Sequence, residues 1–153
     1  MNIKINRIHS RKHTPMCNQS GTLHIDNQYF CDTEENILTA LPPGKYRICR
    51  HLCKQYGLQM PIIVPASAQP LHTPDCSQCQ QLEYVSLNTL RPCLCRMLRG
   101  GNGVHHLIDG SIIVGTRSKA NGCLIHPFKA FKNLRERIRL AMKRGSDVTL
   151  TIQ

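Results

Sequence analysis

The sequence has 153 residues, of which 41% are hydrophobic, which is enough for one compact domain with a core but not for two. Lysine and arginine number 20 against 9 aspartate and glutamate residues, so the formal net charge is +11. Because the apolar residues are clustered, this composition excludes a disordered polyelectrolyte and predicts a folded protein with a basic surface. The longest apolar stretch, around Met60 to Ala66, contains two prolines and is too short to cross a bilayer. The N-terminus lacks the apolar core of a signal peptide, so we expect a cytoplasmic protein with no membrane span.

Alternating apolar and polar residues predict several short strands in the first half of the chain. The segment Asn2 to Ile8 alternates in this way and predicts a half-buried strand. Short apolar-rich runs flank Asp26 and Asn27, and because both residues tolerate positive φ, a hairpin is expected there. Residues 10–20 are polar and are expected to form a loop. Two further strands are expected, at Lys45 to Cys49 and at Pro61 to Val64.

The C-terminal residues carry the clearest pattern. Pro127 suits the first position of a helix, and Gly145 suits the residue just past its end. Between them, apolar residues recur at steps of three and four and predict one buried stripe, which consists of Phe131, Leu134, Ile138 and Ala141. Alternation after Gly145 predicts a terminal strand at residues 148–152. Strands are also expected at Leu82 to Leu87 and at Ser111 to Val114.

These elements predict an α+β, mainly β fold of compact antiparallel or mixed strands. Its one long C-terminal amphipathic helix should pack on the sheet and lead into the terminal strand. The opposite side of that helix carries five cations, and we expect them to be exposed because burying an unpaired charge is costly. They form a candidate polyanion-binding surface, consisting of Lys129, Lys132, Arg135, Arg139 and Lys143. The chain has few aromatic residues and no tryptophan, which argues against stacking of single-stranded bases. A diffuse basic surface without a specific partner is the alternative.

Several short motifs follow one another in a fixed order. They are Gly21-Thr22-Leu23-His24-Ile25-Asp26, Phe30-Cys31-Asp32-Thr33-Glu34-Glu35, Leu41-Pro42-Pro43-Gly44-Lys45-Tyr46, Gly101-Asn102 and Gly110-Ser111-Ile112-Ile113-Val114-Gly115. With the final helix and strand, they resemble the domain-of-unknown-function family 5675 of bacterial and phage proteins, which has no established activity. We therefore expect a single domain over residues 1–153, with a cysteine-rich insertion at about 66–98. Family members often carry a His and a Cys where this chain has Arg99 and Ser111, so that pair is not kept.

A Gly-Cys step lies ahead of the final helix. Gly122-Cys123-Leu124 precedes the helix and strand, and His105 and His106 lie upstream. This order resembles the end of the L,D-transpeptidases, β-rich enzymes in which such a Gly-Cys has an upstream His. The resemblance implies acyl transfer by a Cys123 thiolate, with His105, His106 or His126 accepting its proton. The arginine expected after the Gly-Cys is absent. In the alternative interpretation Cys123 is a small buried residue that fills space between helix and sheet.

Nine cysteines without a signal peptide indicate reduced thiols, some of which could hold a metal. Four of them form a Cys-x-x-Cys and a Cys-x-Cys pair, and four thiolates suit tetrahedral zinc. These candidate ligands are Cys76, Cys79, Cys93 and Cys95. Unligated thiols or a disulfide are the alternatives. Cys49 and Cys53 have no partner motif, and we interpret them as packing residues.

Two function classes remain open. Three acids, Asp32, Glu34 and Glu35, could suggest acid–base chemistry, but we expect them to lie in a solvated turn. The favoured hypothesis is a non-catalytic structural or interaction module whose basic surface binds a polyanion. The alternative is a cell-wall-directed thiol enzyme that uses Cys123 with a nearby His and acts on a cell-wall peptide.

Overall fold

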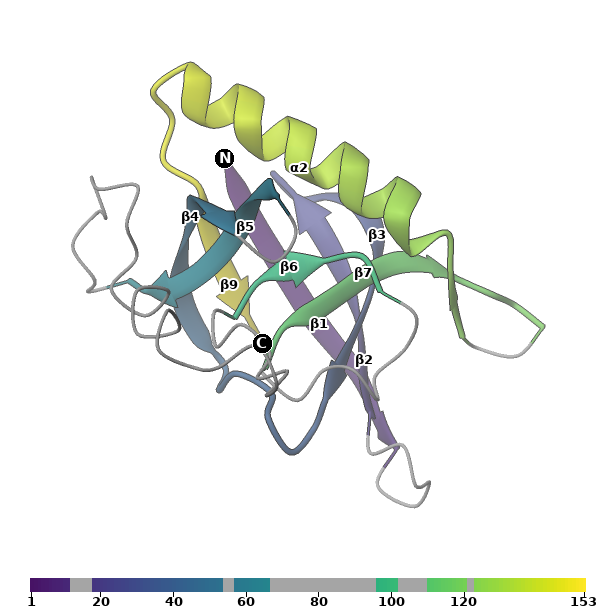
Figure 1. The fold of residues 1–153 in the computed structure, drawn as a ribbon. Coiled ribbons are helices and arrows are strands. Elements are labelled where there is room, and N and C mark those ends of the chain that lie inside the picture. The colour runs from purple at the N-terminus through teal and green to yellow at the C-terminus, as the bar shows by residue number, and fades with distance from the viewer. Residues whose placement is uncertain (12–17, 54–56, 67–95, 102–109, 121–122) are drawn as a thin grey trace, which may run out of the picture.

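The computed structural model describes residues 1–11, 18–53, 57–66, 96–101, 110–120 and 123–153 (Figure 1). These residues form one strongly curved sheet and one helix. The elements are β1 (Asn2–Arg11), β2 (Asn18–Ile25), β3 (Gln28–Asn36), β4 (Gly44–Cys53), β5 (Leu58–Pro65), β6 (Leu98–Arg99), β7 (Ile112–Arg117), β8 (Leu124–Ile125), α2 (Pro127–Lys143) and β9 (Thr149–Ile152). The predicted fold class, mainly β with a C-terminal helix and a terminal strand, is confirmed.

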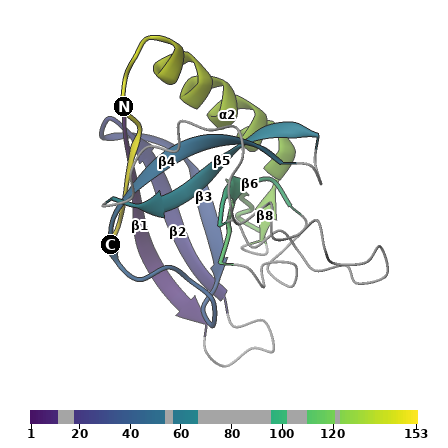
Figure 2. The same cartoon turned by 60° about the vertical axis from the view of Figure 1, so that its left-hand side comes forward.

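The sheet has the strand order β5-β4-β9-β1-β2-β3-β7-β6, with β8 paired to β7. Most pairs are antiparallel, whereas β1 with β9 and β6 with β7 are parallel, so the sheet is mixed. The two ends of this order also meet. The Ile63 amide donates to the Arg96 carbonyl at 2.8 Å, and Ile62 forms a bridge with Met97. The sheet therefore nearly closes on itself, as the turned view in Figure 2 shows.

The core is formed by the strand residues that point inward, which alternate with residues that point outward. On β1, Ile3 and Ile5 are buried while Asn2 and Lys4 face outward, and the other strands follow the same period of two. The helix α2 lies across one end of the curved sheet and contacts β7, β6 and β5 (Figure 1). It turns Phe131, Leu134 and Ile138 into the core, and Ala141 packs partly buried against them, which confirms the predicted stripe.

The boundaries of α2 follow from local chemistry. Pro127 occupies its first turn, and the preceding His126 adopts a left-handed conformation with φ of 53°. At the other end Gly145 has φ of 74°, and its amide donates to the Met142 carbonyl at 3.0 Å. The Ser146 amide donates to the Ala141 carbonyl at 3.0 Å, which completes a Schellman motif. Within the part of the chain that the structure describes, no helix is long and apolar enough to cross a membrane.

Several predicted boundaries are corrected. The hairpin at Asp26 and Asn27 is confirmed, with φ of 48° and 68°. The loop at residues 10–20 is wrong at both ends, because β1 runs to Arg11 and β2 begins at Asn18. The strand at 111–114 continues to Arg117. The two-residue strands β6 and β8 were not expected, and the strand at 82–87 and most of the proposed insertion lie outside the described residues.

Candidate functional site

The outward side of α2 is a concentration of positive charge. The helix contains six basic residues and one acidic residue, Glu136. Of the five cations predicted to be exposed, Lys129, Lys132 and Lys143 are exposed, and Arg135 and Arg139 are partly exposed. The buried stripe on the other side holds the helix in place, so these side chains extend from a fixed element. We call the five cations with Arg137 the basic helix face.

Three contacts fix the arginines of the basic helix face. Arg139 donates two hydrogen bonds to the Glu136 carboxylate, at 2.8 and 2.6 Å. The guanidinium carbons of Arg135 and Arg137 lie 5.8 and 5.3 Å from the ring centroids of Phe131 and Phe30. The hydrogen bonds from Arg139 hold the pKa of Glu136 below its ordinary value. Glu136 therefore keeps its negative charge and offsets one of the six cations.

Sequence reasoning missed two cations that belong to this region. Arg137 lies off the predicted polar stripe, at the edge of the buried one, and reaches the ring of Phe30 on β3. Arg50, exposed on β4, adds its charge to those that lower the pKa of Glu136. The periodicity of α2 could have indicated Arg137 as a boundary residue. Nothing in the sequence indicated Arg50, because its approach to Glu136 depends on the fold and not on local spacing.

Cys123 is exposed and lies just before β8. Its carbonyl accepts a hydrogen bond from the Ser118 amide at 2.8 Å, within the turn that joins β7 to β8. The interpretation of Cys123 as a buried packing residue is therefore wrong. The strand β8 and the capping residue His126, itself exposed, stand between Cys123 and the first residue of α2.

The other predicted ligands and bases fall outside the described residues. His105 and His106 lie in the segment 102–109, and Cys76, Cys79, Cys93 and Cys95 lie in the segment 67–95. The structure consequently tests neither the proposed base nor the proposed zinc site. Among the residues that are described, no three His, Cys, Asp or Glu side chains are grouped to hold a metal ion.

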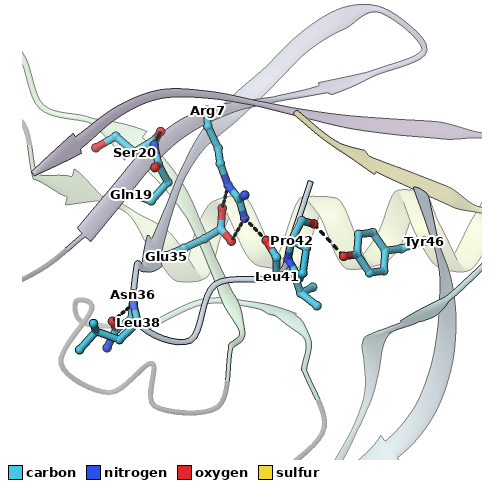
Figure 3. Close-up of polar contacts among 9 residues, drawn as sticks. All are labelled: Arg7, Gln19, Ser20, Glu35, Asn36, Leu38, Leu41, Pro42 and Tyr46. Atoms are coloured by element: carbon cyan, nitrogen blue, oxygen red, sulfur yellow. Dashed lines mark hydrogen bonds and ion pairs between the residues drawn. The ribbon is translucent and has the colours of Figure 1, made fainter. Parts of the chain in front are cut away.

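The acids predicted to lie in a solvated turn instead belong to strand β3, and two of them are buried. Glu35 is 1% exposed, and Arg7 donates from Nε and Nη2 to its two carboxylate oxygens at 3.0 and 2.8 Å (Figure 3). Nη2 of Arg7 also donates to the Leu41 carbonyl at 2.6 Å. In the same close-up the Tyr46 hydroxyl donates to the Pro42 carbonyl at 2.7 Å. The prediction failed because charge alone indicates exposure, whereas a partner on a neighbouring strand allows burial.

The remaining acids of β3 also have structural partners. The Asn18 amide group donates to the buried carboxylate of Glu34. Asp32 accepts hydrogen bonds from the Arg117 amide at 2.7 Å and from the Tyr29 hydroxyl at 3.1 Å. These contacts tie β3 to β2 and β7. They give Asp32, Glu34 and Glu35 a role in holding the sheet together.

Cys31 is the buried thiol of this region. It faces the core from β3 at 4% exposure. Burial, together with the charge of Asp32, raises the pKa of Cys31 from 9.0 to about 12. A thiol held neutral in this way is a poor nucleophile, so Cys31 is a packing residue.

No protein-family model matches the chain, and neither the curated proteins nor the solved structures include a significant match. The chemistry of the described surfaces is therefore the basis for a functional proposal.

Proposed function

We propose that the protein is a non-catalytic, cytoplasmic interaction module that binds a polyanion through the basic helix face. One observation carries this proposal. A helix fixed by its apolar stripe presents six cations and only one carboxylate on its outer side. Such a surface attracts a linear array of negative charges, because each contact releases counterions that the polyanion had condensed.

The three lysines of the basic helix face are the main contacts in this proposal. Lys129, Lys132 and Lys143 form no ion pair with any residue that the structure describes. Because no ion pair within the described part of the chain compensates these charges, a polyanion can replace the solvent ions around them at little cost. Arg139, in contrast, already binds Glu136. The shortage of aromatic side chains favours recognition of backbone charge over stacking on bases.

The direct experiment is retention on immobilised heparin. The variant Lys129→Gln with Lys132→Gln removes two charges from the basic helix face. The control Arg96→Gln with Lys119→Gln removes two exposed charges outside the basic helix face. We expect the helix variant to elute at clearly lower salt than both the wild type and the control. Equal elution of the two variants would show that net charge alone governs retention, and would contradict the proposal.

A thiol enzyme is the second candidate function, and the exposure of Cys123 favours it. A nucleophile must reach its substrate, and a buried sulfur would not. In this proposal Cys123 transfers an acyl group of a cell-wall peptide, with His105, His106 or His126 as the base. The variant Cys123→Ser should keep the melting temperature and lose crosslinking of muropeptides. Absence of crosslinking by the wild-type protein would rule this candidate out.

Two further expectations from the sequence stay proposals. Membership of family 5675 rests on the ordered motifs alone. A structural zinc would be held by Cys76, Cys79, Cys93 and Cys95. Elemental analysis of protein purified without chelator tests the metal. We expect one zinc per chain, and the metal should be lost when Cys76 and Cys79 are both replaced by Ser.

A further inference from the structure

A second basic surface lies on the outer side of three adjacent strands. A groove of about 720 Å³ runs over β4, β9 and β1. The side chains that matter for its chemistry are Asn2, Lys4, Lys45, Arg47, Thr149 and Thr151, with Asp147 at one end. The volume falls within the range of pockets that hold small ligands, roughly 300–1,000 Å³. The sequence did not indicate that these residues form a site, because β4, β9 and β1 are far apart along the chain.

The strand register arranges these side chains in two rows across the sheet. In the first row Thr151 pairs with Lys45 on one side and with Lys4 on the other. In the second row Thr149 pairs with Arg47 and with Asn2 in the same way. Neighbouring strands lie about 4.8 Å apart, so the backbones of Lys4 and Lys45 are separated by roughly 10 Å across Thr151. Two residues along a strand separate the rows by about 7 Å.

The first row contains charged and polar side-chain groups that are not bound to any described residue. Lys4 and Lys45 form no ion pair with any described residue, and within the same part of the chain the Thr151 hydroxyl has no hydrogen-bond partner. Two ammonium groups thus flank a hydroxyl to which no described residue is bonded. Flexible four-carbon stems let both ammonium groups converge on one anion above Thr151.

The second row is partly occupied by the protein's own groups. The Thr149 hydroxyl donates to the Asn2 side-chain oxygen at 2.6 Å. Nη2 of Arg47 lies 3.2 Å from the Asp147 carboxylate, whose side chain is 83% exposed. An ion pair this exposed contributes little and exchanges readily. Arg47 can therefore exchange Asp147 for a second anionic group.

From this arrangement we propose that the groove binds a small ligand carrying two or more linked phosphate groups. One phosphate is held by Lys4, Lys45 and the Thr151 hydroxyl. A second phosphate, one row away, is held by Arg47 in place of Asp147. The groove offers charge and hydroxyl groups, and the one aromatic residue among its described lining is Tyr46, whose hydroxyl is bonded to the Pro42 carbonyl. Linked phosphates match the sign of these cations, and the long side chains of Lys4, Lys45 and Arg47 let their charges converge on phosphates that lie closer together than the two rows. This site is distinct from the basic helix face.

Calorimetric titration with inorganic tripolyphosphate at low ionic strength tests the proposal. We expect Lys4→Gln with Lys45→Gln to weaken binding by about tenfold or more, while the control Arg96→Gln with Lys119→Gln, which removes two exposed charges outside the groove, leaves it nearly unchanged. Asp147→Asn should tighten binding, because it removes the carboxylate that competes for Arg47. Inorganic phosphate should bind more weakly than tripolyphosphate. A melting curve for each variant confirms that it is folded.

Two outcomes would overturn this inference. Equal weakening by Lys4→Gln with Lys45→Gln and by the control Arg96→Gln with Lys119→Gln would mean that only the net charge of the protein attracts tripolyphosphate. Tighter, groove-dependent binding of a single-stranded oligonucleotide than of tripolyphosphate would identify an extended strand as the ligand instead of a small one. Heparin retention tests the basic helix face separately from the titration with tripolyphosphate. Either proposal can therefore fail while the other is supported.

Discussion

Arg7 on β1 binds the carboxylate of Glu35 on β3 through two parallel hydrogen bonds, although 28 residues separate them in the sequence. Both side chains lie on the inner side of the sheet, and they are 15% and 1% exposed. The same guanidinium donates to the Leu41 carbonyl, so it also fixes the segment between β3 and β4. The pair thus connects two strands separated by β2 with the chain that leads into the next strand.

Removal of either partner of this pair should be strongly destabilising. Arg7→Leu leaves the Glu35 carboxylate buried without a counter-charge, and we expect a loss of about 3–5 kcal/mol in the free energy of unfolding. Urea denaturation measures it. The double variant Arg7→Leu with Glu35→Leu should lose clearly less than the sum of the two single variants, since no unpaired charge remains. Additive losses would contradict a direct coupling.

The apolar stripe of α2 should carry much of the stability of the helix. Leu134 is fully buried, so Leu134→Ala should cost about 2–5 kcal/mol, through lost burial and the cavity left behind. The control Asn133→Ala changes an exposed neighbour on the same helix and should stay within about 0.5 kcal/mol of the wild type. Both are measured by urea denaturation. Similar small losses for the two variants would mean that α2 is not held by this stripe.

The raised pKa of Cys31 predicts a particular loss of stability in alkali. The unfolded thiol ionises near 9.0 and the folded one near about 12, so in this interval the unfolded state binds fewer protons than the folded state. The contribution of the Cys31 thiol to the free energy of unfolding is fully present below pH 9 and decreases as the pH rises towards 12. Cys31→Ala removes the thiol and this dependence.

Urea denaturation of both proteins between pH 7 and about pH 10.5 checks this prediction. At pH 7 the wild type should be the more stable, because Ala fills less of the core. Its advantage should shrink steadily above about pH 9. A constant difference across the whole range would show that the Cys31 thiol ionises no less readily in the folded protein.

Local patterns predicted the elements whose signals lie within a few residues. The hairpin at Asp26 and Asn27 followed from two residues that tolerate positive φ, and α2 followed from the spacing of Phe131, Leu134 and Ile138. Strands β6 and β8 were missed because two residues are too few to show a period of two. Such short strands are set by their neighbours rather than by their own residues.

Contacts between distant segments limited the prediction of sites. The burial of Glu35 depends on Arg7, and the groove depends on β9 lying between β1 and β4. Neither pairing leaves a local signature, whereas the cations of α2 repeat at helical spacing and were found from the sequence. Charge indicated five of the six cations of the basic helix face correctly, because α2 has solvent on its outer side. The same reasoning was wrong for Glu34 and Glu35 on β3, because partners on other strands allow these carboxylates to be buried.

The salt dependence of polyanion binding tests the basic helix face most directly. The affinity for a short DNA duplex, used as a polyanion probe, is measured over a range of salt concentrations for the wild type, for Lys129→Gln with Lys132→Gln, and for the control Arg96→Gln with Lys119→Gln. Each lost phosphate contact lowers the slope of log K against log salt by about 0.9, so we predict a slope smaller by about 2 for the helix variant alone. Identical slopes for the wild type and the helix variant would contradict the proposed function.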